Sequence, residues 1–260
     1  MITAGIDMGA KFIKVVILND GQIAAKTQEQ AGFEPKEAAE KAYHRALSEA
    51  GVTAQQINLV FGTGAGRKVA PFANDTVTEV SAAARGAIFL HPSVRTVIDI
   101  GGEEGRAVKC DEQGKVQDFA VNEKCAAGAG SFTEAMARAL EVKLEEFGQL
   151  SLKSTKTIPM NAQCAVFAES EVVSLLHTKT PKADISRAVH DAIASRIISM
   201  VRRVGINPDI ALVGGVSYNV GFVDAMNRGL ETQVIVPKDA EYIGALGAAL
   251  SAKTNLEKPD

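Results

Sequence analysis

Cysteine is scarce in this sequence. The 260 residues include three cysteines, Cys110, Cys125 and Cys164, and no Cys-x-x-Cys pair. This count and spacing exclude a disulfide framework, and reduced thiols favour a cytoplasmic location. The four histidines are scattered without a His-x-x-x-His pair, so the sequence does not predict a zinc site.

Long apolar runs and an excess of one charge are also missing. No apolar segment approaches the length that a membrane-spanning helix needs. The start, MITAGIDMG, reaches an aspartate at once and is not expected to act as a signal peptide. The 28 basic and 31 acidic residues are mixed, which argues against nucleic acid as a partner. The 46% hydrophobic content supports a large core, and only residues 253–260 are expected to be disordered.

One pattern occurs twice. An apolar run ends in Ile-Asp-x-Gly at residues 6–9, and another ends in the same way at residues 98–101. Each continues into a second apolar run and then into a turn signal, Asn19-Asp20-Gly21 in one copy and Glu112-Gln113-Gly114 in the other. The pattern predicts a duplicated unit that begins with three strands.

A helical pattern follows each set of strands, over Pro35–Gly51 in the first copy and Gly130–Leu140 in the second. Duplication predicts an α/β protein of two similar domains that face each other across a cleft. We expect the first domain to span residues 1–92, with a C-terminal helix at 240–252 packed back on it. The second domain is expected to span residues 93–239.

The two Asp-x-Gly turns are candidate phosphate sites. Glycine permits a tight turn whose backbone N–H groups point at an anion, and the aspartate can hold the water shell of a Mg²⁺ ion. One such turn could simply end a strand, but two at matching places favour function. The sequence therefore assigns catalytic roles to Asp7 and Asp99. The turn residues assigned to nucleotide binding are Gly9, Ala10, Lys11, Gly101, Gly102 and Glu103. Lys14 either reaches phosphate or is a solvated strand lysine.

A third glycine turn follows the apolar segment before Gly214-Gly215, and a helix is expected from about Asn219. Glycines at a strand-to-helix junction allow a ligand to approach the backbone closely, so all three residues are assigned to nucleotide binding. A fourth glycine-rich strand end, VFGTGAGR at residues 60–67, finishes with Arg67, which could supply a positive charge there. The Walker A and Gly-x-Gly-x-x-Gly patterns are missing, which disfavours P-loop and Rossmann folds.

A set of segments resembles one protein family in order and approximate spacing. The segments are GIDMGAKFIK, VFGTGAGR, VIDIGG, NEKCAAGAGSF, CAVFAESEV, LVGGV and YIGALGAAL. They resemble the ATPase component of 2-hydroxyacyl-CoA dehydratase activators and of ATP-dependent benzoyl-CoA reductases, within the acetate kinase/sugar kinase/Hsc70/actin superfamily. The resemblance implies two duplicated actin-like (ribonuclease H-like) domains around a cleft that binds ATP and Mg²⁺. It also implies that Gly244 lies near the adenosine, although packing alone would explain a glycine there.

The cysteine motifs are the specific part of the resemblance, because sugar kinases and actins lack them. The family implies one [4Fe-4S] cluster shared by two subunits, identical or paralogous, with Cys125 and Cys164 as the ligands of each chain. A helix is expected after each cysteine, and helix N-termini stabilise the negative charge of a thiolate-bound cluster. Small residues, Gly128 among them, let the backbone approach the cluster. Cys110 lies in a strand-like run and is assigned no role.

The resemblance further implies an electron-transfer function. Reduced ferredoxin or flavodoxin loads the cluster, and ATP hydrolysis then drives a low-potential electron to an acyl-CoA-transforming partner. The segment GRAVKCDEQGKV is closer to the reductase subunits, which favours the benzoyl-CoA reductase branch. The first turn, Ala10-Lys11, departs from the Ser- and Thr-rich loop of the activators. A small-molecule kinase of the same superfamily is the alternative function, and a regulator that only binds ATP is a third.

Overall fold

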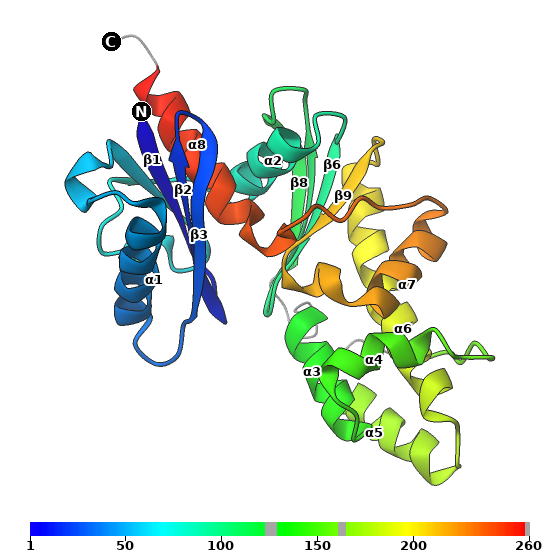
Figure 1. Ribbon diagram of the computed structural model, residues 1–260. Coiled ribbons are helices and arrows are strands. Elements are labelled where there is room, and N and C mark those ends of the chain that lie inside the picture. Colours follow the sequence, from blue (N-terminus) through cyan, green and yellow to red (C-terminus); the bar gives the residue numbers. More distant parts are fainter. Residues whose placement is uncertain (123–128, 161–164, 258–260) are drawn as a thin grey trace. The chain divides into compact units, whose positions relative to one another are not determined.

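The computed structural model describes residues 1–122, 129–160 and 165–257. The chain divides into two compact units, which are described separately (Figure 1). Unit 1 comprises Met1–Val97, Cys110–Gln117 and Pro237–Asp260. Unit 2 comprises Ile98–Lys109 and Asp118–Val236. Among the described residues, no helix combines the length and the apolar character that crossing a membrane requires.

Unit 1 is built on a five-stranded mixed sheet with the order β3-β2-β1-β4-β5. Strands β1 and β2 are antiparallel, as are β2 and β3, whereas β1 and β4 are parallel. The turn between β2 and β3 has positive φ at Asp20 and Gly21, which confirms the predicted hairpin. The strands are β1 (Ile2–Met8), β2 (Phe12–Asn19), β3 (Gln22–Gln30), β4 (Leu59–Thr63) and β5 (Asp75–Thr76).

Helices cover both faces of this sheet. Helix α1 (Pro35–Ala50) begins at a proline and ends at Gly51, whose φ of 66° gives the left-handed C-cap predicted from the sequence. Its alanines and Tyr43 pack on alternate residues of β1 and β2. Helix α8 (Ile243–Leu256) packs on the opposite face and against α2 (Glu79–Leu90). The short helices of this unit are η1 (Ala54–Gln56), η2 (Arg67–Val69) and η4 (Ala240–Tyr242).

Small residues let α8 lie very close to its neighbours. A Cβ atom added at Gly5 of β1 would lie 2.0 Å from the Ala245 carbonyl oxygen. A Cβ atom added at Gly247 would lie 1.8 Å from the Ala82 carbonyl oxygen. The run of small residues in α8 is therefore required by packing against both the sheet and α2.

The second sheet has four strands in the order β8-β7-β6-β9, which repeats the order β3-β2-β1-β4 of the first. This repetition matches the duplication expected from the sequence, and the predicted α/β class is confirmed. The strands are β6 (Thr96–Ile100), β7 (Gly105–Cys110), β8 (Val116–Asn122) and β9 (Ile210–Val213).

The helices of unit 2 enclose a large apolar cluster with strands β6 and β9. Helix α6 packs against α4 and α7, and α3 packs against α5. These helices are α3 (Ala129–Ala139), α4 (Leu144–Ser151), α5 (Ala165–His177), α6 (Lys182–Val204) and α7 (Val220–Leu230), with the short η3 (Gly215–Tyr218) before α7.

The expectation of a disordered tail from residue 253 is wrong for its first part. Helix α8 continues to Leu256, and Lys253 forms an ion pair with Glu257 one turn later at 3.6 Å. This pairing at i, i+4 supports the last turn of the helix, beyond its packed part.

Candidate functional site

The first Asp-x-Gly turn lies at the carboxyl end of β1. Asp7 faces Lys14 across the β1–β2 ladder, and the Lys14 Nζ atom lies 3.3 Å from Asp7 Oδ2. The two side chains are only 17% and 16% exposed. Lys14 is therefore a partly buried partner of the aspartate and not a solvated strand lysine.

Glycines surround the Asp7 carboxylate on its other sides. Gly64 follows β4 with a φ of 88°, and a Cβ atom there would lie 2.5 Å from Asp7 Oδ1. A Cβ atom at Gly244, in the first turn of α8, would lie 3.3 Å from Asp7 Oδ2. Arg67 donates to the Gly64 carbonyl at 3.1 Å and pairs with Glu79 at 3.0 Å. Arg67 thus holds the loop that approaches Asp7, while its charge is paired with α2.

The second Asp-x-Gly turn has the same construction. Asp99 on β6 accepts a hydrogen bond from Arg106 Nη1 on β7 at 3.2 Å, and these side chains are 20% and 11% exposed. Arg106 also pairs with Glu104. Gly214 follows β9 with a φ of 86°, and a Cβ atom there would lie 2.9 Å from Asp99 Oδ1.

The two units therefore carry equivalent sites. Each has an aspartate at a strand end, a cation seven residues later, and a glycine of positive φ against the carboxylate. Sequence reasoning missed Arg106 as the counterpart of Lys14, although the alignment of the two repeats contained that signal. A carboxylate beside a cation and an open glycine turn can hold a hydrated metal ion and accept phosphate oxygens at the backbone.

The second turn also contacts the start of α3. The Gly101 N–H donates to the Glu104 carbonyl at 2.9 Å and closes the turn. The Ser131 N–H donates to the Gly102 carbonyl at 2.9 Å, and Gly130 approaches so closely that a Cβ atom there would lie 2.9 Å from Gly102 Cα. The first residues of α3 are thus hydrogen-bonded to a candidate phosphate turn.

The other predicted nucleotide residues occupy different settings. Ala10 is exposed and Lys11 half-buried in the turn that follows Gly9. Gly215 is exposed, and a Cβ atom there would meet nothing within 4 Å. The Asn219 side-chain oxygen accepts from the N–H groups of residues 221 and 222 at 3.0 and 3.2 Å, so it caps α7. This capping bond gives Asn219 a structural role.

Of the cysteines, only Cys110 lies within the described residues; Cys125 and Cys164, with Gly128, lie outside them. Helix α3 begins at residue 129 and α5 at residue 165, shortly after the two cysteines. Cys110 is 1% exposed in β7, and burial raises the pKa of its thiol to about 11. It therefore stays protonated at neutral pH and is a poor metal ligand.

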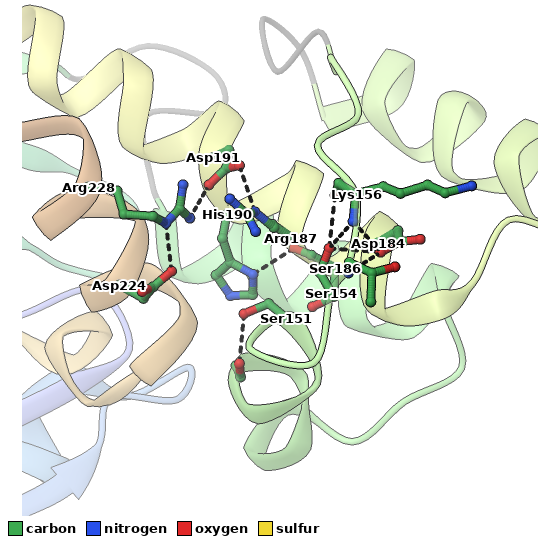
Figure 2. Close-up of polar contacts among 12 residues, drawn as sticks. Ser151, Ser154, Lys156, Asp184, Ser186, Arg187, His190, Asp191, Asp224 and Arg228 are labelled. Atoms are coloured by element: carbon green, nitrogen blue, oxygen red, sulfur yellow. Dashed lines mark hydrogen bonds and ion pairs between the residues drawn. The ribbon is translucent and has the colours of Figure 1, made fainter.

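A polar network joins α6 to the segment that follows α4, and to α7, within unit 2 (Figure 2). Asp184 accepts from the Ser154 hydroxyl at 2.8 Å, and Asp191 pairs with Arg228 at 2.5 Å. His190 bonds the Ser186 carbonyl through Nδ1, and burial lowers its pKa to about 4. The described residues hold no group of three or more His, Cys, Asp or Glu side chains that could bind a metal ion.

Comparison with known proteins identifies the family. Residues 4–252 match the BadF/BadG/BcrA/BcrD ATPase family, and the chain belongs to it. The activator of lactoyl-CoA dehydratase from Anaerotignum propionicum is 40% identical over 99% of this chain and 100% of its own length. A subunit of the benzoyl-CoA reductase from Thauera aromatica is 32% identical over 99% of this chain and 95% of its own length. These identities favour the dehydratase activators, contrary to the preference for the reductase branch drawn from the sequence.

Solved structures show the same relationship. Component A of the (R)-2-hydroxyglutaryl-CoA dehydratase from Acidaminococcus fermentans superposes with a TM-score of 0.94 at 38% identity, covering 99% of this chain and 100% of that one. The 2-hydroxyisocaproyl-CoA dehydratase activator from Clostridium difficile, solved with bound ADPNP, gives 0.90 at 36% identity, covering 100% and 99%. A Streptomyces griseus ROK family glucokinase gives 0.61 at 17% identity, covering 98% and 100%, and shares the fold alone. The actin-like fold expected from the sequence is confirmed.

Proposed function

We propose that this chain hydrolyses Mg-ATP to drive a low-potential electron from reduced ferredoxin or flavodoxin into an acyl-CoA dehydratase. The observation that carries the proposal is the duplicated aspartate turn, with Asp7–Lys14 in one unit and Asp99–Arg106 in the other. Two dehydratase activators are 40% identical to this chain over nearly its whole length, which supports a dehydratase as the partner.

In this proposal the two aspartates face the hydrated Mg²⁺ ion of the substrate. The Gly9–Lys11 turn, Gly101-Gly102 and Gly214-Gly215 supply backbone N–H groups to the phosphates. The cations beside the aspartates reduce the repulsion between carboxylate and phosphate. A relative solved with bound ADPNP supports a nucleotide as the ligand. In the same proposal Gly244 lies beside the Asp7 carboxylate, near the bound nucleotide.

The proposal assigns Cys125 and Cys164 of two copies, or of this chain and a paralogue, as ligands of one [4Fe-4S] cluster. Two cysteines per chain supply the four thiolates that a cubane cluster needs, and the cluster supplies one-electron transfer when bound. The described part of the chain fits this role, because α3 and α5 begin shortly after these cysteines and pack against each other. Helix starts favour the negative charge of a thiolate-ligated cluster.

The contact between the second turn and α3 offers a path for coupling. The Gly102 carbonyl accepts from Ser131 at the start of α3, and the chain reaches Cys125 a few residues before that helix. If phosphate at Gly101-Gly102 moves this turn, α3 moves with it. Its N-terminal dipole would then shift relative to the cysteine ligands, and a bound cluster would change its reduction potential in response.

The alternative is a small-molecule kinase. Its support is the fold shared with a glucokinase, at an identity that carries no functional inference. A kinase transfers phosphate only when its acceptor is present, whereas the proposed subunit hydrolyses ATP and carries iron.

The test is to isolate the protein without oxygen, measure iron and ATP hydrolysis, and identify what co-purifies. We expect a brown protein with ATPase activity that retains a dehydratase subunit. A colourless protein that consumes ATP only when a sugar or an acid is added would refute the proposal and support the kinase. Co-purification of benzoyl-CoA reductase subunits would instead identify a reductase of that type as the partner.

A further inference from the structure

A buried threonine hydroxyl near the first Asp-x-Gly turn has no hydrogen-bond partner among the described residues. Thr63 is 1% exposed, and within the described parts of the chain its Oγ1 atom bonds to nothing. Two other buried threonines of the same sheet are satisfied. Thr3 donates to the Ala249 carbonyl at 3.1 Å, and Thr27 donates to the Ala42 carbonyl at 2.7 Å. A hydroxyl removed from water without a partner is unfavourable, so its presence at Thr63 calls for an explanation.

Thr63 is the last residue of β4 and pairs with Asp7 in the parallel register with β1. Residues paired in this way point to the same face of a sheet. That face is the one covered by α8, because Phe61, two residues earlier on β4, packs against Ala248. A Cβ atom at Gly244 would lie 3.8 Å from Thr63 Cγ2 and 3.3 Å from Asp7 Oδ2. The Thr63 methyl group and the Asp7 carboxylate therefore both lie near Gly244, in the first turn of α8.

The N-terminus of α8 also lies at this place. Helix α8 directly follows the short η4, and no side chain caps it through a hydrogen bond. A helix N-terminus carries the positive end of the helix dipole, which favours an anionic group nearby. The Asp7 carboxylate, the Thr63 side chain and the start of α8 thus lie close together, and the Asp7 side chain is 17% exposed.

We propose that Thr63 is a positioning residue that, together with Asp7, binds one water molecule of the Mg-ATP hydration shell. This inference rests on the proposed ATPase function. The Thr63 hydroxyl makes no direct hydrogen bond to Asp7. A water molecule that donates to the carboxylate and accepts from the hydroxyl satisfies both groups. The fixed water holds the Asp7 carboxylate in one orientation toward the metal.

The test compares Thr63→Val and Thr63→Ser, with Thr27→Val as a matched control. Valine keeps the shape of threonine and removes a hydroxyl that lacks a protein partner. We therefore expect Thr63→Val to keep the melting temperature or raise it by about 2–4 °C. Its kcat for Mg-ATP hydrolysis should fall about tenfold, the effect of one lost hydrogen bond in the transition state. Thr63→Ser should restore most of the rate.

The control should show the opposite pattern. Thr27→Val removes a satisfied hydrogen bond on β3, so its melting temperature should fall while kcat stays at the wild-type value. Wild-type kcat in Thr63→Val would overturn the inference and leave the ATPase proposal intact. Loss of melting temperature and rate together in Thr63→Val would make the hydroxyl structural and would also overturn it. Wild-type protein that neither binds nor hydrolyses Mg-ATP would refute the proposed function and this inference with it.

Discussion

Replacing Asp99 by asparagine separates the chemistry of the second turn from its packing. Asparagine keeps the shape of the side chain and removes its charge. The weakened ion pair joins Asp99 to Arg106 at 3.2 Å, and the two side chains are 20% and 11% exposed. Because asparagine keeps an oxygen that can accept the Arg106 hydrogen bond, the free energy of unfolding should fall by only about 1–2 kcal/mol. Arg106 also keeps its second partner, Glu104. Against a typical stability of about 5–15 kcal/mol, the variant stays folded.

The rate of ATP hydrolysis should fall far more than the stability does. If the Asp99 charge orients the hydrated metal ion, its loss lowers kcat at least about 100-fold. The assay is phosphate release from Mg-ATP, measured beside a urea-unfolding curve for the same protein. Asp191→Asn is the control, because Asp191 is 24% exposed and pairs with Arg228 at 2.5 Å and with Arg187 at 3.5 Å in the network of unit 2.

The control should lose at least as much stability and keep its full ATPase activity. Wild-type turnover in Asp99→Asn would refute the role of this carboxylate. An equal loss of turnover in Asp191→Asn would show that lower stability, and not the missing charge, explains the effect.

Three further predictions follow from the described residues. Gly214→Ala should destabilise unit 2 by about 1–3 kcal/mol in urea unfolding, because φ of Gly214 is 86° and the added methyl would lie 2.3 Å from a backbone oxygen. Gly215→Ala should leave the stability unchanged, because a methyl there meets no atom within 4 Å. Burial lowers the pKa of His190 from 6.5 to about 4, so the unfolded chain binds more protons than the folded chain at pH values below about 6.5. The free energy of unfolding should therefore fall by about 2 kcal/mol when the pH is lowered from 7 to 5. His190→Gln should remove this slope, whereas His44→Gln, at an exposed position, should keep it. Cys110→Ala should leave the iron content unchanged by colorimetric assay, because the buried thiol stays protonated.

Local signals made much of the fold predictable. The Asn19-Asp20-Gly21 hairpin and the glycine that ends α1 depend on backbone angles that few residues other than glycine, asparagine and aspartate adopt. Repetition of Ile-Asp-x-Gly then pointed to Asp7 and Asp99 as equivalent residues. The structure confirms that each lies at a strand end against a glycine of positive φ.

Interactions between distant residues were not predictable in the same way. The pairing of Arg67 with Glu79, and the burial of Thr63 without a partner, depend on how α2 and α8 pack on the sheet. Asn219 stays assigned to the nucleotide, and its side-chain oxygen also caps α7, a contact that the sequence assignment did not include. Residue types in a pattern indicate what a side chain can bind. Its actual hydrogen-bond or ion-pair partner depends on how the helices and strands pack.

The most direct test of the account is the iron and acid-labile sulfide content of the anaerobically isolated protein and its cysteine variants. We predict about four irons and four sulfides per two chains. Cys125→Ala and Cys164→Ala should each lose the iron and shift the protein from dimer to monomer in anaerobic size-exclusion chromatography. Cys110→Ala should do neither. Iron retained in both Cys125→Ala and Cys164→Ala, or absent from the wild-type protein, would contradict the account.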